Sequence, residues 1–291
     1  KPIEAGDFFR EILDCAERAG SLSALKDIRR QKLDWMKEAS LQLSRLDIQE
    51  ALRAYEQQGH IHGVSQEDRV VQIAKTYVKK SQTLIPENYS FSFDRKQFLY
   101  QQGLVLAYTH RDCHQLNQAI RQKLKEGSFI APDDAFVLKG KGYALGDTIV
   151  FLKNDKKDVS LFNEEGVLEK TLFIKNGDRG KIRSVNRLND QGLSDQGSSD
   201  QGSNSQNPNW RVTVELLAEN GVQRFAMFDT AAYESIDHGY ALTLHKAQGQ
   251  TVDFTLIAAS RHMDAKALYV ALTRHRYDAQ LYYDHQEFSS Y

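Results

Sequence analysis

The sequence predicts an α/β fold: a parallel sheet with a small all-β barrel inserted into it and a helical N-terminal region. Three observations predict this fold. Apolar residues recur at helical spacing through most of residues 1–100. Residues 101–137 and 236–291 alternate apolar runs with helical patterns, as βα units of a parallel sheet do. Between them, residues 138–235 contain short alternating segments separated by Gly-Asp and Asn-Gly turns, a pattern typical of a small barrel or sandwich.

The N-terminal region is expected to be helical. Residues 7–20 place apolar side chains on one helical face, and Gly20 is a plausible stop. Residues 30–59 predict two helices that end at Gly59. Residues 67–80 predict a further helix.

Two blocks carry the strands of the expected parallel sheet. The run GLVLAY, residues 103–108, is apolar throughout, which indicates a strand buried on both faces. A helical pattern follows it over residues 109–127. Near the end of the chain, residues 254–260 predict a strand, 264–276 a helix and 279–284 a strand.

The expected insert, residues 138–235, includes a polar tract. Residues 189–209 repeat the triplet Asp-Gln-Gly three times and offer no apolar face, so we expect a flexible hairpin tip. Residues 139–187 hold eleven Lys and Arg against seven Asp and Glu, an excess of about four positive charges. This excess fits either a solvated barrel surface or one wall of a nucleic-acid channel.

The composition excludes several classes of protein. The formal net charge of −1 argues against a purely electrostatic nucleic-acid binder but leaves room for a local basic groove. Two distant cysteines make neither a disulfide framework nor a zinc site, which favours a reducing, cytoplasmic compartment. No apolar run reaches the ~18 residues of a membrane helix, so no membrane insertion is expected. Because the chain opens on KPIEAG without a methionine, we expect a fragment or a processed product.

A polar segment, TLHKAQGQT at residues 243–251, lies just before the strand expected at 254–260. On a short helix at the edge of a parallel sheet, its hydroxyl, imidazole and backbone N–H groups could contact phosphates. Taken singly, His245 fits an ordinary core or surface histidine, and Gln248-Gly249 fits a turn.

A second segment, LYVALTRHR at residues 268–276, ends an apolar helical pattern with basic residues. An arginine there could bind a phosphoryl group through its planar guanidinium. The alternative is that basic residues at a helix C-terminus only favour the helix dipole.

Together the two segments resemble motifs V and VI of superfamily-one helicases of the RecD-like branch. VLAYTHRDCHQLNQAIR, residues 105–121, is similar to the strand and helix that open their second RecA-like lobe, and the insert resembles their SH3-like module. IRRQ, residues 28–31, resembles the motif that places an arginine at the nucleotide. KPIEAGDFFREI, residues 1–12, resembles the helicase region of conjugative relaxases of the TraA/MobA kind. The resemblance covers nearly the whole chain.

The resemblance implies a function and roles for individual residues. It implies an ATP-dependent 5′ to 3′ DNA helicase or translocase acting in plasmid transfer, with single-stranded DNA, a first RecA-like lobe and conjugation machinery as partners. It implies that Arg274 is an arginine finger and Arg30 a second sensor of the γ-phosphate. Gln248 and Gly249 would lie at the nucleotide interface between lobes. The residues implied to bind DNA through its backbone, without reading its sequence, are Thr109, Thr243, His245 and Lys246.

One departure from the family decides what the chain can do by itself. No G-x-x-x-x-G-K-[ST] is present, KGKGYA at residues 139–144 lacks the required frame, and no acidic magnesium motif follows a buried strand. ATP and Mg²⁺ are therefore expected only in the intact parent, with the first lobe before Lys1, and no metal site is expected in this chain.

Two other functions remain open. The chain could be a degenerate lobe that serves only as a single-stranded DNA-binding or recruitment module. The retained Arg274 and residues 243–251 favour an active motor, because a simple binder needs no arginine finger. An unrelated α/β hydrolase has little support, because no Gly-x-Ser-x-Gly elbow and no metal-ligand spacing occur.

Overall fold

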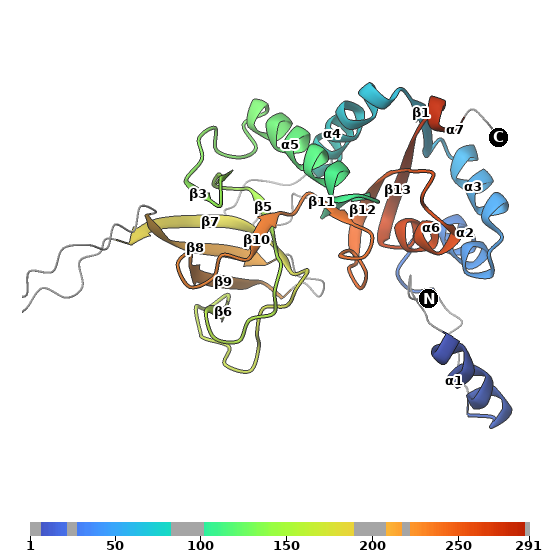
Figure 1. The fold of residues 1–291 in the computed structure, drawn as a ribbon, viewed down its shortest axis with the longest axis horizontal. Helices are drawn as coiled ribbons and strands as arrows, with labels where there is room; N and C mark the ends of the chain where they lie inside the picture. Colours follow the sequence, from blue (N-terminus) through green and yellow to red (C-terminus); the bar gives the residue numbers. More distant parts are fainter. Residues whose placement is uncertain (1–6, 22–27, 83–101, 189–207, 217–221, 289–291) are drawn as a thin grey trace, which may run out of the picture. The chain divides into compact units, whose positions relative to one another are not determined.

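The computed structural model describes residues 7–21, 28–82, 102–188, 208–216 and 222–288 (Figure 1). The chain divides into two compact units, the first made of residues 1–123 and 240–291 and the second of residues 124–239. The chain therefore leaves the first unit once, builds the second and returns. Each unit has its own main sheet. Among the described residues, no helix has both the length and the apolar character needed to cross a membrane.

The first unit contains a five-stranded sheet with the order β1-β13-β12-β2-β11, in which every pair is parallel. Its strands are β1 (Ile61–Val64), β2 (Gly103–Ala107), β11 (Ala241–Thr243), β12 (Val252–Ala258) and β13 (His275–Asp284). The two apolar runs predicted from the sequence, β2 and β12, pair directly, with Val105 opposite Leu256. All of β2 is buried, as a continuous apolar run predicts, but Tyr108 at the end of the predicted run lies outside the strand and is exposed. The parallel α/β sheet expected for a RecA-like lobe is therefore confirmed.

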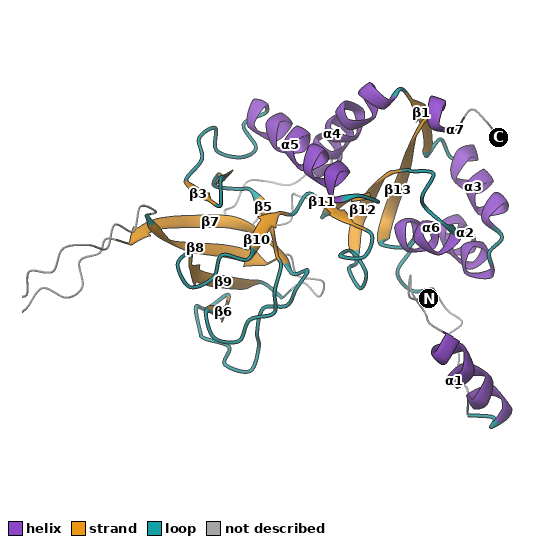
Figure 2. Ribbon diagram, in the orientation of Figure 1, coloured by secondary structure: helices purple, strands orange, loops and turns teal. Residues whose placement is uncertain are grey.

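Helices pack on both faces of this sheet. The helices that the structure describes are α1 (Asp7–Arg18), α2 (Asp34–Arg45), α3 (Ile48–Gln57), α4 (Gln66–Gln82), α5 (His110–Glu126), α6 (Ala265–Leu272) and α7 (His285–Phe288). Helix α4 packs against β13, β12 and β2, whereas α6 packs against β12 and α2 on the other side (Figure 2). The helices expected over 7–20, 30–59 and 67–80 are confirmed. Gly20 and Gly59 follow their helices with φ of 64° and 71°, a left-handed conformation that suits glycine.

One element was not predicted and two expectations are wrong. The mostly helical N-terminal region also contains β1, a four-residue strand that pairs with β13. The helix expected over 264–276 ends at Leu272, and β13 begins at His275, because the backbone there pairs with β12. The polar segment forms consecutive turns over residues 244–249 instead of a short helix.

The second unit is built from antiparallel strands. They are β3 (Phe136–Leu138), β4 (Lys141–Tyr143), β5 (Thr148–Phe151), β6 (Val159–Asn163), β7 (Arg179–Leu188), β8 (Asn209–Leu216), β9 (Arg224–Asp229) and β10 (Ile236–His238). Six of them form one sheet with the order β10-β5-β7-β8-β9-β6, and β3 pairs with β4. The expected insert of residues 138–235 lies within this unit.

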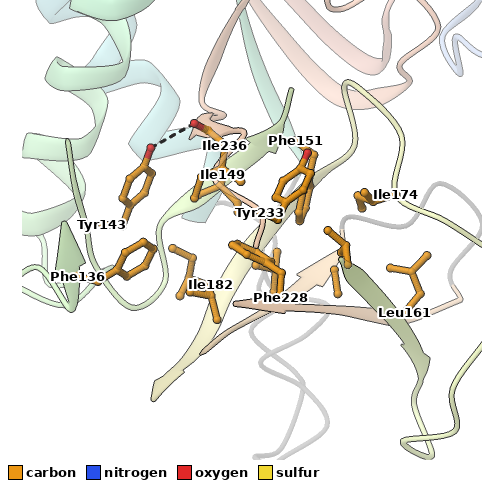
Figure 3. Packing of buried hydrophobic residues seen from close by; sticks show 14 residues of the cluster. Phe136, Tyr143, Ile149, Phe151, Leu161, Ile174, Ile182, Phe228, Tyr233 and Ile236 are labelled. Carbon is orange, nitrogen blue, oxygen red and sulfur yellow. Dashed lines mark hydrogen bonds between the residues drawn. The ribbon is translucent and has the colours of Figure 1, made fainter. Parts of the chain in front are cut away.

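One apolar cluster fills the second unit (Figure 3). Both edge strands contribute to it, Leu161 from β6 and Ile236 from β10, together with Phe151 and Phe228 from strands between them. Because residues from both edges meet in one cluster, the sheet must curl around its own inner face. The expected flexible tip, residues 189–209, lies outside the described residues except for its last two positions, and Asn209 begins β8.

Candidate functional site

The sequence-predicted site residues lie at two opposite edges of the parallel sheet. All five strands run the same way, so their carboxyl ends meet at one edge and their amino ends at the other. We call these the carboxyl edge, formed by residues 108–110, 243–246 and 259–263, and the amino edge, formed by residues 30–31, 251 and 273–275. Thr109 and Thr243 lie at the carboxyl edge, since they follow β2 and end β11. Arg274 lies at the amino edge, directly before β13.

At the amino edge, Arg30 joins the starts of two strands. Its Nε donates a hydrogen bond to Thr251 Oγ1 at 3.1 Å, directly before β12. Its Nη1 donates to the backbone oxygen of Thr273 at 2.6 Å, although the two residues are 243 positions apart. The half-buried Arg30 guanidinium is thus held between the ends of β12 and β13.

Arg274 binds the same threonine from the other side. Its Nη2 donates to Thr273 Oγ1 at 3.3 Å, and its Nε donates to the backbone oxygen of Val270 at 3.1 Å, in the last turn of α6. Only 9% of Arg274 is exposed. Burial, together with the nearby Arg30 charge, lowers the pKa of Arg274 to about 10, so it stays protonated at neutral pH. Among the described residues, no carboxylate forms an ion pair with it.

Gln31 is a further residue of the amino edge, and no role for its side chain was predicted from the sequence. Its Nε2 donates to the backbone oxygens of Thr273 and His275, each at 3.2 Å, and Gln31 is buried. The next residue, Lys32, donates its backbone N–H to Arg276 O at 2.9 Å. Residues 30–32 are therefore hydrogen-bonded to residues 273–276. The only signal in the sequence was the position of Gln31 beside Arg30 in IRRQ.

His275 follows Arg274 directly and is completely buried. Its Nε2 lies 3.2 Å from Met36 Sδ, and its Nδ1 has no hydrogen-bond partner among the described residues. Burial lowers the pKa of His275 to about 4. The ring is therefore neutral at physiological pH, and it adds no positive charge near Arg30.

Arg276 has a different environment from Arg274. It lies in β13, and its Nη1 forms an ion pair with Asp253 Oδ1 at 2.9 Å. Asp253 also accepts the backbone N–H of Gln102 at 2.9 Å. Arg276 therefore connects the start of β13 to the start of β12. Arg274, the other arginine of the Thr-Arg-His-Arg run, has no acidic partner among the described residues.

The polar segment 243–251 connects the two edges, because it runs from the end of β11 to the start of β12. Thr243 is buried, and its backbone oxygen accepts the N–H of Ala247 at 3.0 Å. His245, Gln248 and Gly249 are exposed, and Lys246 is half-buried. Gly249 has a φ of 91°, and a Cβ added there would meet no atom within 4 Å. Its role is therefore conformational.

At the carboxyl edge, Thr109 has a structural role. Its Oγ1 accepts the backbone N–H of Asp112 at 3.1 Å and donates to the Asp112 carboxylate at 2.7 Å. These bonds cap the N-terminus of α5, as a threonine before a helix commonly does. Thr109 is exposed, so a second role in binding DNA stays a prediction.

The structure also shows a positioning residue that the sequence did not indicate. Asn117 on α5 is buried, and its Oδ1 accepts the backbone N–H groups of Tyr240 and Ala241 at 3.0 and 2.8 Å. Its Nδ2 donates to Ala241 O at 3.0 Å. One side chain therefore holds the start of β11, the short strand that leads into residues 243–251.

The predicted residues thus form two groups. Arg30 and Arg274 are brought together on Thr273, and Thr109 and Thr243 follow neighbouring strands, with Thr243 opposite Ala107. Gln248 and Gly249 lie in the connection between the groups. Within the described segments, no cluster of His, Cys, Asp and Glu could hold a metal ion.

Two family models match parts of the chain. An AAA domain matches residues 1–66, and a UvrD-like helicase C-terminal domain matches residues 238–279. The second match contains residues 243–251 and Arg274.

Curated relatives match nearly the whole chain. The conjugal transfer protein TraA of Rhizobium radiobacter is 34% identical over 99% of this chain, and TraA of Agrobacterium fabrum is 33% identical over the same share. A probable TraA of Sinorhizobium fredii is also 33% identical. The chain spans 21% of the length of each of these relatives. The resemblance to a superfamily-one helicase region of conjugative relaxases is therefore confirmed.

The solved structures that match this chain are more distant in sequence. The Pif1 helicase from Candida albicans has a TM-score of 0.42 and 15% identity, covering 90% of this chain and 57% of that one. Bacteroides Pif1 bound to ssDNA has a TM-score of 0.38 and 15% identity, covering 87% of this chain and 50% of that one.

Proposed function

We propose that this chain supplies the second motor lobe of an ATP-dependent DNA helicase that moves 5′ to 3′ and acts in conjugative plasmid transfer in the cytoplasm. The relation to TraA proteins and the UvrD-like match over residues 238–279 support the assignment. The observation that carries it is the convergence of Arg30 and Arg274 on Thr273.

Two adjacent guanidinium groups repel each other, which raises the free energy of the folded protein unless an anion binds to them. Their mutual repulsion already lowers the pKa of Arg274, next to the larger effect of burial. The N–H groups on Arg274 Nη1 make no hydrogen bond to the described residues, so they can bind oxygen atoms of an incoming group. A γ-phosphate presented by another lobe fits this need, because a planar guanidinium binds phosphoryl oxygens in a bidentate manner.

ATP and Mg²⁺ would be held by the other lobe, since this sequence has no phosphate loop. ATP supplies the phosphoryl group that is transferred. Arg274 would stabilise the charge that develops on that group, and Arg30 would hold Thr251 and Thr273 in place beside it. Gln248 and Gly249 would lie on the side of the lobe that meets the nucleotide.

DNA would bind at the carboxyl edge. Thr109, His245 and Lys246 would offer hydroxyl, imidazole and ammonium groups to sugars and phosphates there, and Thr243, which is buried, would have to be uncovered to contact them. The segment 243–251 ends at Thr251, whose Oγ1 accepts a hydrogen bond from Arg30. A movement of Arg30 at the amino edge can therefore be transmitted through this one short segment to the proposed DNA-binding residues at the carboxyl edge. The curled sheet of the second unit would be an SH3-like module.

The test uses a longer polypeptide that carries this chain together with a phosphate-loop lobe. Replacing Arg274 with Ala should reduce DNA-stimulated ATP hydrolysis by about 10³- to 10⁵-fold and leave DNA binding nearly unchanged. Arg274→Lys should restore little, because an ammonium group cannot replace the planar fork.

The matched control is Arg276→Ala, which removes an arginine two residues away that is paired with Asp253. Its hydrolysis rate should stay within a few-fold of the parent. If Arg274→Ala instead lowers only thermal stability, then the contact with Val270 is a helix cap and the motor assignment fails. Retained DNA binding without any ATP hydrolysis in the unsubstituted parent would support the degenerate binding or recruitment module.

A further inference from the structure

Two exposed aromatic rings meet at the carboxyl edge, and the function proposed above does not use them. The rings of Tyr108 and His262 stack with centroids 5.9 Å apart and an interplanar angle of 30°. Tyr108 is 43% exposed, and His262 is exposed as well. Tyr108 directly follows β2, and His262 lies in the loop between β12 and α6.

Tyr108 and His262 follow two adjacent strands, β2 and β12, at a place in the sheet where ligands commonly bind. After β2 the chain proceeds to β11, which lies on one side of β2. After β12 it proceeds to β13, which lies on the opposite side. The connections leave two adjacent strands in opposite directions, and in open parallel sheets such a switch point opens a crevice at the carboxyl ends of the strands. Tyr108 and His262 occupy the two loops that border it.

Hydrogen bonding does not explain why a tyrosine stands at position 108. The buried tyrosines Tyr55 and Tyr282 of this unit use their hydroxyl groups, since Tyr55 donates to Leu272 O and Tyr282 donates to Thr76 Oγ1. Among the described residues, the hydroxyl of Tyr108 has no hydrogen-bond partner, and its ring stacks only on His262. A large ring is thus partly exposed at the surface, and its hydroxyl makes no hydrogen bond to the described residues.

Positive charge adjoins the rings in the sequence. Arg261 precedes His262, and Arg111 lies in the first turn of α5, three residues after Tyr108. Both arginines are exposed, and neither forms an ion pair with any residue in the described ranges. Surfaces that combine aromatic rings with cationic side chains bind single-stranded nucleic acid, because bases stack on the rings and phosphates bind the cations.

We propose that Tyr108 and His262 form a stacking platform for one base of single-stranded DNA, with Arg111 and Arg261 on the flanking phosphates. The platform rests on the DNA-binding function assigned above to the carboxyl edge, and it adds a base contact where the sequence indicated only backbone contacts. Every base has a flat face, so the platform selects single strands without selecting a sequence. A duplex hides those faces, so the platform discriminates against it.

The test compares two oligonucleotides of equal length and charge, oligo(dT) and a fully abasic strand, bound to the complete 291-residue chain. Tyr108→Ala should weaken oligo(dT) binding by about 5- to 150-fold, which corresponds to the loss of one stacked base. The abasic strand should bind both proteins equally. Tyr108→Phe should bind oligo(dT) like the parent, because the ring is kept, and His262→Ala should weaken oligo(dT) in the same direction as Tyr108→Ala.

The matched control is Tyr277→Ala, which removes a tyrosine of similar exposure, 46%, from β13. It should leave both affinities unchanged, and thermal unfolding should show that every variant is folded. Equal binding of oligo(dT) by the parent and Tyr108→Ala would overturn the platform and leave the DNA-binding function standing. An absence of any DNA binding by the parent chain would overturn both.

Discussion

The two edges of the parallel sheet differ in how their polar groups are satisfied. At the amino edge, Gln31, Thr273, Arg274 and His275 are buried and bind one another or nearby backbone. At the carboxyl edge, Tyr108, Thr109 and His245 are exposed. One sheet therefore presents a closed, pre-arranged edge and an open one.

This difference fits the two kinds of ligand that we propose. A group that stabilises a transition state must be held in place before the reaction, because reorganising it during the reaction would cost part of the stabilisation. Buried hydrogen bonds provide that order at the amino edge. A strand of DNA that slides past the protein needs an accessible surface with contacts that form and break, and the carboxyl edge provides one.

The largest expected effect is an acid sensitivity contributed by His275 at the amino edge. The pKa of buried His275 is lowered to about 4 from an ordinary value of 6.5, so the unfolded chain binds more protons between these two values. The free energy of unfolding contributed by this group should therefore fall as pH drops from about 6.5, by up to about 3 kcal/mol below pH 4. His275→Gln should remove this loss.

Denaturant unfolding at a series of pH values measures this loss of unfolding free energy. The control is His262→Gln, which removes an exposed histidine of the carboxyl edge. The neighbouring His60 has a raised pKa, mainly because it hydrogen-bonds Asp278, so it contributes stability that is lost as pH rises. The difference in unfolding free energy between the parent and His275→Gln at each pH isolates the contribution of His275 from that of His60. Parallel pH curves for these two proteins would show that His275 is not buried in a neutral state.

The second effect concerns the support of the carboxyl edge. Asn117→Ala leaves two buried N–H groups and one carbonyl at the start of β11 without their partner, at a cost of about 2–3 kcal/mol. Thermal unfolding measures the cost, and hydrogen exchange at the Tyr240 and Ala241 amides should accelerate. The adjacent and exposed Gln118→Ala should change neither quantity, which makes it a matched control.

A smaller effect is expected in the connection between the edges. Gly249→Ala places a side chain on a residue with φ of 91°, which costs about 1–2 kcal/mol although there is space for the methyl group. Gln248→Ala, one residue earlier and exposed, should be neutral. If chemical unfolding shows the same stability for both variants, the turn does not require its left-handed conformation.

The smallest effect separates the two roles of Thr109. Thr109→Ala should lower the free energy of unfolding by about 1 kcal/mol through loss of the α5 cap. Thr109→Asn should keep most of that stability, because asparagine also caps helices. Unfolding and single-stranded DNA binding are measured on both variants. Weakened DNA binding by Thr109→Asn at parental stability would show a DNA contact, whereas unchanged binding would leave Thr109 as a cap alone.

Much of the fold was accessible from local patterns in the sequence. The apolar runs of β2 and β12 predicted neighbouring buried strands because a strand covered on both faces has no polar side. The ends of two helices were predictable from Gly20 and Gly59, since glycine adopts the left-handed backbone that ends a helix. The residues that we assign to nucleotide and DNA binding came from the resemblance carried by residues 28–31, 105–121, 243–251 and 268–276.

The tertiary structure alone decided how these segments meet. The end of α6 at Leu272 could not be read from the sequence, because helical spacing continues to Arg276 and only pairing with β12 turns residues 275–276 into strand. The binding of Arg30 to Thr273 joins residues 243 positions apart, and the stacking of Tyr108 on His262 depends on the order of strands in the sheet. Periodicity along a chain reports which face of an element is buried. It carries no information about which distant backbone supplies the hydrogen bonds, and those bonds determined the two edges of this sheet.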